Sequence, residues 1–173
     1  MTLTEARAAD REGRIEAAAT AYEEALASGD APLDALIDLA VLYWQSTEYG
    51  FWKSLGLSPA FVDKAAERFP QLLAQAEQLY PERPEPRFWK RYTAWADLGE
   101  PFEVTEAEAL LRKHPDHLEP AMMLYSVRPS SEHEAQAREL LRACRTAGTT
   151  RCRYGASVIE GALKRKTSRP FSR

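Results

Sequence analysis

The chain has 173 residues, of which 45% are hydrophobic and 28% are charged, and its formal net charge at pH 7 is −3. This composition is typical of a globular protein with its own core, and the length suits one domain. No apolar run approaches the roughly 18 residues of a transmembrane helix, and two cysteines are too few for a disulfide scaffold. The N-terminal residues are charged from Glu5 onward and contain no apolar run, which argues against a secretory signal and favours a cytoplasmic location.

The residue pattern predicts an all-α protein. Ala, Leu, Glu and Arg are abundant, β-branched residues are sparse, and apolar residues recur with a helical period. About nine helices are expected, at residues 3–12, 14–28, 31–46, 59–79, 85–98, 105–114, 118–127, 131–147 and 152–166. Pro70 lies inside the fourth of these helices and is expected to kink or split it near Phe69, because proline removes a backbone hydrogen bond and clashes with the preceding turn.

Start and stop signals mark the ends of these helices. Capping boxes, in which a hydroxyl and a carboxylate satisfy free N–H groups reciprocally, are expected at Thr2–Glu5, Thr105–Glu108 and Ser131–Glu134. Asp30 and Ser58 stand just before Ala31-Pro32 and Pro59, as N-cap residues do before a proline in the first turn. The glycines expected to end helices are Gly13, Gly29, Gly99 and Gly148.

The segment from Thr47 to Leu57, TEYGFWKSLGL, has no clear period and contains three aromatic residues. We expect it to be an irregular insertion between helices. An exposed aromatic segment at residues 49–57 would also suit burial in a homodimer, so self-association is one alternative for this part of the chain.

Charge is unevenly distributed. Residues 1–50 carry three Arg against ten Asp and Glu, a net charge of −7, whereas residues 145–173 carry eight Lys and Arg against one Glu, a net charge of +7. We expect residues 1–166 to form one helical domain and residues 167–173 to be a basic C-terminal tail. Such a tail either serves an interaction or keeps a frayed terminus solvated.

The early helices carry the spacing of a known repeat. Ala18, Tyr22 and Ala25 have the A-x3-aromatic-x2-A spacing, in which small alanines let paired helices approach and the ring fills the gap to the next pair. The next helix carries Leu39-Ala40-x2-Tyr43. These residues resemble the tetratricopeptide repeat (TPR). The resemblance is good over residues 3–44, looser over 62–115 and only architectural over 116–166.

The resemblance implies antiparallel helix pairs stacked in a TPR-like α-α superhelix. A strict 34-residue period from Ala25 would place the next matching alanine at Pro59, but the matching residue is Ala76. An insertion that contains residues 47–57 accounts for the difference. A plain α-α superhelix without true repeats is the alternative.

The same resemblance implies a groove that binds a partner segment, because the first helix of each TPR pair lines the concave side. The residues that would line it are Asp34, Ile37, Val41, Trp44, Gln45, Arg87, Lys90 and Arg91. Trp44 would serve as an aromatic anchor, and the three cations would form one basic face that grips an acidic segment or a carboxylate. The alternative is a solvated basic face paired with nearby glutamates such as Glu85. The chain contains no Asn, so the family's carboxylate clamp is not expected.

Catalytic signals are weak. His114 and His117 flank Pro115 in a predicted loop, where exposed histidines are expected rather than metal ligands. Phosphate-binding loops, dinucleotide fingerprints and nucleophile-elbow motifs are absent from the sequence. We therefore expect no enzyme activity, no cofactor and no bound metal.

The sequence favours a non-catalytic protein–protein interaction module that docks a partner segment in a helical groove. Its partner would be another protein or peptide, acidic where it meets the basic face, and not a membrane. Nucleic-acid binding through the basic tail would be non-specific and salt-sensitive. Two alternatives stay open: an immunity or inhibitor protein that binds a toxin or enzyme through the acidic first 50 residues, and an enzyme whose site is assembled from distant helices.

Overall fold

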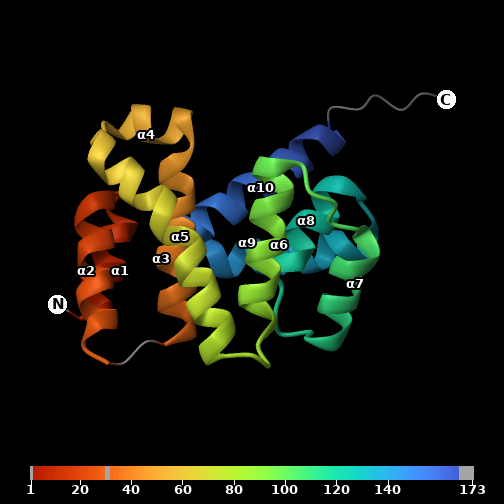
Figure 1. Ribbon diagram of the computed structural model, residues 1–173. Coiled ribbons are helices and arrows are strands. Elements are labelled where there is room, and N and C mark those ends of the chain that lie inside the picture. Colours follow the sequence, from red (N-terminus) through yellow and green to blue (C-terminus); the bar gives the residue numbers. More distant parts are fainter. Residues whose placement is uncertain (1, 30–31, 168–173) are drawn as a thin grey trace. The chain divides into compact units, whose positions relative to one another are not determined.

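A computed structural model describes residues 2–29 and 32–167 of the chain. These residues form ten α-helices and no β-strand (Figure 1), which confirms the all-α prediction. Within the same described residues, no helix is long and apolar enough to cross a membrane. The contacts divide the chain into two compact units, one of residues 1–100 with 148–151 and one of residues 101–147 with 152–173.

Unit 1 is built from six helices, together with residues 148–151, which include the first two residues of α10 (Thr150–Thr167). The six are α1 (Leu3–Arg11), α2 (Ile15–Ala27), α3 (Leu33–Thr47), α4 (Tyr49–Leu55), α5 (Pro59–Leu79) and α6 (Pro84–Leu98). Helices α1 and α2 lie side by side as a pair, α3 packs against α2 and α5, and α6 packs against both α5 and α3. Helix α3 is therefore the central element of this unit, and twelve of its fifteen residues are buried.

The helix pair at the N-terminus is packed as the repeat spacing predicts. Ala18 is 0% exposed, Ala25 is 5% exposed and the ring of Tyr22 is fully buried. Small side chains at these positions let α1 and α2 approach closely.

A carboxylate on α2 ties three helices of unit 1 together. Glu23 accepts hydrogen bonds from Arg68 on α5, with Nε to Oε1 at 2.9 Å and the second guanidinium nitrogen to Oε2 at 3.0 Å, and from the hydroxyl of Tyr43 on α3 at 3.2 Å. The Glu23 side chain is only 23% exposed. A paired, two-point contact of this kind is stronger than an ordinary surface ion pair.

Two of the predicted helix starts are confirmed. Thr2 and Glu5 form the complete capping box of α1, since Thr2 Oγ1 accepts from Glu5 N and Glu5 Oε2 accepts from Thr2 N. Ser58 caps α5, which begins at Pro59. The four predicted glycine stops are also confirmed, because Gly13, Gly29, Gly99 and Gly148 all have positive φ. Asp30 lies outside the described residues.

The other two capping boxes are wrong. Helix α7 begins at Val104, with Glu103 at its N-cap, so Thr105 is already inside the helix. At the start of α9 the capping hydroxyl belongs to Ser130, which accepts from His133 N at 3.1 Å, one residue before the predicted Ser131. Ser130 and Ser131 each have a hydroxyl that could cap a helix, and the residue types alone do not decide which of them does.

The segment between α3 and α5 is not irregular, and this prediction is wrong. Residues 49–55 form α4, a helix in addition to the nine that were expected. Glu48 caps its start by accepting from the backbone N–H groups of Gly50 and Phe51, and Gly56 ends it with φ of 64°. None of its residues is buried, so the helix owes its form to its two caps rather than to an apolar face.

Helix α5 continues through Pro70 without the predicted split. The proline withdraws one hydrogen bond from the carbonyl of Ala66, four residues earlier, and Ala66 is exposed so that water can solvate that carbonyl. Ala65, Leu72 and Leu73 are buried on either side of the proline. Packing of this apolar face therefore outweighs the local effect of the proline.

Unit 2 consists of α7 (Val104–Lys113), α8 (Glu119–Val127), α9 (Ser131–Ala147) and α10 (Thr150–Thr167), whose first two residues count with unit 1. Helix α8 is apolar and packs against both α7 and α9. Ion pairs join α9 to α10, with Arg145 at 2.8 Å from Glu160 and Lys166 at 2.5 Å from Glu134. Apart from Thr167, the last residue of α10, the predicted basic tail lies outside the described residues.

Because α1 and α2 approach closely, we expect acidic substitutions at two neighbouring alanines to differ sharply in their effect on stability. Ala18→Glu should destabilise unit 1 by on the order of 3–5 kcal/mol, because it places an unpaired charge in a buried interface. Ala17 is exposed on the same helix, so Ala17→Glu should change stability by less than about 0.5 kcal/mol. Urea unfolding followed by circular dichroism measures both, and equal midpoints would show that the helix pair is packed differently.

Candidate functional site on helices α1, α3 and α6

Helices α3 and α6 run in the same direction. Near their C-terminal ends, Trp44 Nε1 donates a hydrogen bond to Asp97 at 2.6 Å. Near their N-terminal ends, the pKa of Arg83 is raised by its hydrogen bond with Glu85 and, to a smaller extent, by the charge of Asp34. Interactions between the two helices therefore occur near both of their ends.

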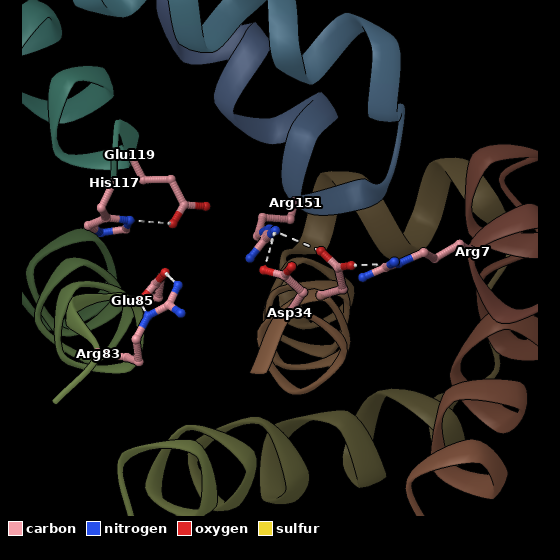
Figure 2. Close-up of polar contacts among 8 residues, drawn as sticks. Arg7, Asp34, Arg83, Glu85, His117, Glu119 and Arg151 are labelled. Carbon is pink, nitrogen blue, oxygen red and sulfur yellow. Dashed lines mark hydrogen bonds and ion pairs between the residues drawn. The ribbon is translucent and has the colours of Figure 1, made fainter. Parts of the chain in front are cut away.

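A buried carboxylate lies at the centre of this side of unit 1. Asp38 on α3 is 2% exposed and forms ion pairs with two arginines that come from different elements. Arg7 of α1 places Nε 3.4 Å from Asp38 Oδ2, and Arg151 at the start of α10 places Nε 3.0 Å from Asp38 Oδ1. Arg151 also lies 3.6 Å from Asp34 (Figure 2). Two guanidinium groups thus compensate the burial of this carboxylate.

A second buried carboxylate holds the same part of the chain. Asp10 on α1 is fully buried and accepts from the backbone N–H of Thr150 at 2.9 Å and from its hydroxyl at 2.6 Å. Gly148, with φ of 66°, turns the chain into this position, and a Cβ there would lie 3.4 Å from the Arg11 side chain.

These contacts define a docked segment and the face that receives it. We call residues 148–151 the docking segment, and the surface of α1 and α3 that carries Asp10, Asp34 and Asp38 the carboxylate face. The segment is about 140 residues away from Asp10 in the sequence, yet side chains of α1 and α3 bind both its backbone and its side chains. The face is therefore able to bind a short stretch of polypeptide.

Sequence reasoning missed Asp10, Asp38, Thr150 and Arg151. One signal was present: Asp38 interrupts an otherwise apolar helical run, LDALIDLAVLYW. A lone acidic residue on a buried helix must be paired, because an uncompensated buried charge is strongly unfavourable. The sequence contains no corresponding signal for the partner, Arg151, which lies more than a hundred residues away.

The hydroxyl of Tyr22 lies in the same buried environment. Burial raises the pKa of Tyr22, and the charges of Asp38 and Asp10 raise it further, while Arg7 opposes them. The group is therefore held in its neutral form well above the pH at which an exposed tyrosine ionises.

Three of the predicted groove residues on α3 are buried. Ile37 is 0%, Val41 is 1% and Trp44 is 4% exposed. The Trp44 ring packs against Trp89 and Tyr92 of α6, with ring centroids 6.2 and 6.1 Å away. Trp44 thus contacts the core of its own unit. The other two predicted residues of this helix are accessible, since the Asp34 side chain is 65% exposed and Gln45 is half-buried.

The three predicted cations on α6 differ in their surroundings. Arg87 is exposed and Arg91 is half-buried. Lys90 pairs with Glu77 of α5 at 2.9 Å. The predicted local partner Glu85 instead pairs with Arg83. Local pairing therefore accounts for Lys90.

The histidines of unit 2 depart from expectation. His117 is 7% exposed rather than an exposed loop residue, and its Nδ1 lies 3.6 Å from Glu119. His117 follows the turn at residues 115–116 and is buried there, which the loop assignment did not anticipate. Within residues 2–29 and 32–167, no three His, Cys, Asp or Glu side chains are grouped closely enough to hold a metal ion.

Comparisons with models of protein families, with curated proteins and with solved structures found no significant match to this chain. The geometry of the carboxylate face and of α6 therefore carries the functional argument.

Tyr22 predicts a loss of stability at alkaline pH. Its pKa is raised in the folded state, so above about pH 10 the unfolded chain loses a proton that the folded chain keeps, and stability falls as pH rises. Tyr22→Phe should remove up to about 1.4 kcal/mol per pH unit of this slope. Urea titrations between pH 9 and about 11 measure it. The exposed Tyr49→Phe is the control, and an equal change in both variants would refute the assignment.

Because Trp44 packs inside its own unit, we expect its substitution to lower the stability of unit 1 whether or not a partner is present. Trp44→Ala should destabilise unit 1 by about 3–5 kcal/mol, because it removes the ring between α3 and α6. Trp44→Phe should cost about 1–2 kcal/mol, since it keeps an aromatic ring but loses the hydrogen bond to Asp97. Thermal unfolding compares them with Tyr49→Ala, whose 68% exposed side chain should matter least. Similar melting of all three would contradict this packing.

Proposed function

We propose that this chain is a non-catalytic, TPR-like protein-interaction module of the cytoplasm, which docks an acidic segment of a partner protein on the α3–α6 side of unit 1. One observation carries the proposal: Arg87 and Arg91 lie one turn apart on α6, which Trp44 of α3 holds in place by ring packing and a hydrogen bond to Asp97. Guanidinium groups on a rigid helix have the chemistry to bind carboxylates of a partner segment.

The helix arrangement supports the TPR-like part of the proposal. Helix α5 packs against both α3 and α6, and α3 and α6 run in the same direction. Parallel first helices with a second helix between them are the arrangement that the repeat spacing at Ala18 and Ala25 implies. The helix α4 is the departure, and it lengthens the connection between α3 and α5.

Two arginines of α6, the exposed Arg87 and the half-buried Arg91, indicate the chemistry of the partner. Arg87 and Arg91 are four residues apart, so their guanidinium groups share one face of the helix. Two guanidinium groups at this spacing suit carboxylates of a partner segment, because each can form paired, charge-assisted hydrogen bonds. Asp34 stands on the neighbouring helix with a 65% exposed side chain and would repel a misplaced carboxylate, which fixes the register. In this proposal Trp44 holds α6 against α3.

The partner and the site are tested together by site-specific crosslinking. A photoreactive amino acid at position 87 or 91 of α6 should crosslink to one partner protein in the native cell extract. The same amino acid at Glu67, which is exposed on α5, should not crosslink to it. Equal crosslinking from all three positions would contradict docking on this side of unit 1.

Charge reversal then tests the chemistry with that purified partner. Arg87→Glu/Arg91→Glu should weaken binding at least tenfold. Arg87→Glu alone should also weaken binding and leave the melting temperature nearly unchanged, because Arg87 is exposed and exposed charges contribute little to folding. Arg112→Glu/Lys113→Glu makes the same change in net charge as the double variant, on exposed residues of α7, and should bind like the parent. Binding should also weaken as salt rises. Unchanged affinity of the α6 variant would refute the acidic-segment proposal.

A further inference from the structure

The docking segment has an unusual position in the chain. Residues 148–151 belong to unit 1, although the residues on both sides of them belong to unit 2. The only peptide bond between residues 1–100 and residues 101–173 is the one that follows residue 100. The docking segment is therefore bound to the carboxylate face by non-covalent contacts alone.

The docking segment completes the carboxylate face. With the segment in place Asp10 is 0% and Asp38 is 2% exposed, and the segment supplies two hydrogen-bond donors of Thr150 to the first and the Arg151 guanidinium to the second. Hydrogen bonds and ion pairs that are shielded from water in this way are stronger than exposed ones. The docked form of the segment is stabilised by these contacts.

The contacts do not require that the face and the segment belong to the same chain. They join side chains of α1 and α3 to Thr150 and Arg151, which stand about 140 residues from Asp10 and more than a hundred from Asp38. A second copy offers the same N–H, hydroxyl and guanidinium groups. Exchange between copies keeps each buried contact, so its cost is mainly the entropy of association.

The one covalent connection has the character of a hinge. Helix α6 ends at Leu98, Gly99 has φ of 67°, and residues 99–103 are not helical. Residues 98–101 are exposed, with Leu98 74% exposed, whereas Phe102 is buried. The exposed residues before Phe102 can absorb a change of backbone angles.

We propose that the carboxylate face binds the docking segment of a second copy of this chain, so that two copies associate by reciprocal exchange. Thr150 and Arg151 of each copy then complete the Asp10 and Asp38 contacts of the other. This inference does not depend on the acidic-segment proposal, which concerns α6.

Complementation between two defective full-length chains tests the exchange. The segment-defective chain carries Thr150→Ala/Arg151→Gln and keeps its face, whereas the face-defective chain carries Asp10→Asn/Asp38→Asn and keeps its segment. Each alone should melt roughly 10 °C or more below the parent. After joint incubation at high concentration, the intact face and the intact segment can meet only between chains.

The expected result is a heterodimer by native mass spectrometry, together with recovery of the parental melting transition for the chain that keeps its face. The matched control mixes the segment-defective chain with a chain that carries all four substitutions, and it should show no recovery. A mixture that melts as the sum of its two components would overturn the proposal. A heterodimer without recovery would also overturn it, because another surface would then hold the copies together.

The parent chain provides a second measurement that does not depend on how well the variants fold. Its dimer fraction should rise with concentration from micromolar to millimolar. It should be unaffected by Tyr49→Ala, which trims the exposed aromatic surface of α4. A parent that stays monomeric throughout this range, or a dimer that Tyr49→Ala abolishes, would refute exchange of the docking segment.

Discussion

The pairing of two buried carboxylates with one distant segment is the constraint on which the rest of unit 1 depends. Asp10 and Asp38 lie where water cannot solvate them, so their donors must come from the protein itself. Thr150 donates hydrogen bonds to Asp10, Arg7 donates one to Asp38, and Arg151 forms an ion pair with Asp38. This requirement fixes the relative positions of α1, α3 and the start of α10.

A second, aromatic contact sets the geometry of the proposed partner site. Trp44 packs between α3 and α6 and donates to Asp97, which holds the two helices parallel and close. The exposed Arg87 and the half-buried Arg91 consequently lie on a rigid helix rather than on a loop. Large apolar rings stabilise the folded state most when they are buried, whereas guanidinium groups can bind carboxylates at an accessible surface.

The two proposals concern opposite charges on neighbouring helices. The carboxylate face binds an arginine-bearing segment of this same chain, and the α6 cations suit an acidic segment of another protein. Like-charge repulsion keeps each ligand from the other surface, so the two sites would discriminate between their ligands without additional contacts. Exchange of the docking segment would pair two α6 surfaces in one assembly, and a dimer of this kind would offer a partner two equivalent sites.

The sequence by itself determined the local structure. Helical periodicity, the Thr2–Glu5 and Ser58 caps and the glycine stops depend on residues within one or two turns of each other, and the structure confirms them. The pairing of α1 with α2 followed from Ala18 and Ala25 for the same reason. Tertiary structure decided what depends on distant residues. In α5 the helix continues through Pro70, Trp44 is buried against α6 and His117 is buried, because the free energy of burial outweighs a local preference. Arg151 lies beside Asp38 because a buried carboxylate requires a positive charge nearby, and no sequence spacing connects these two residues.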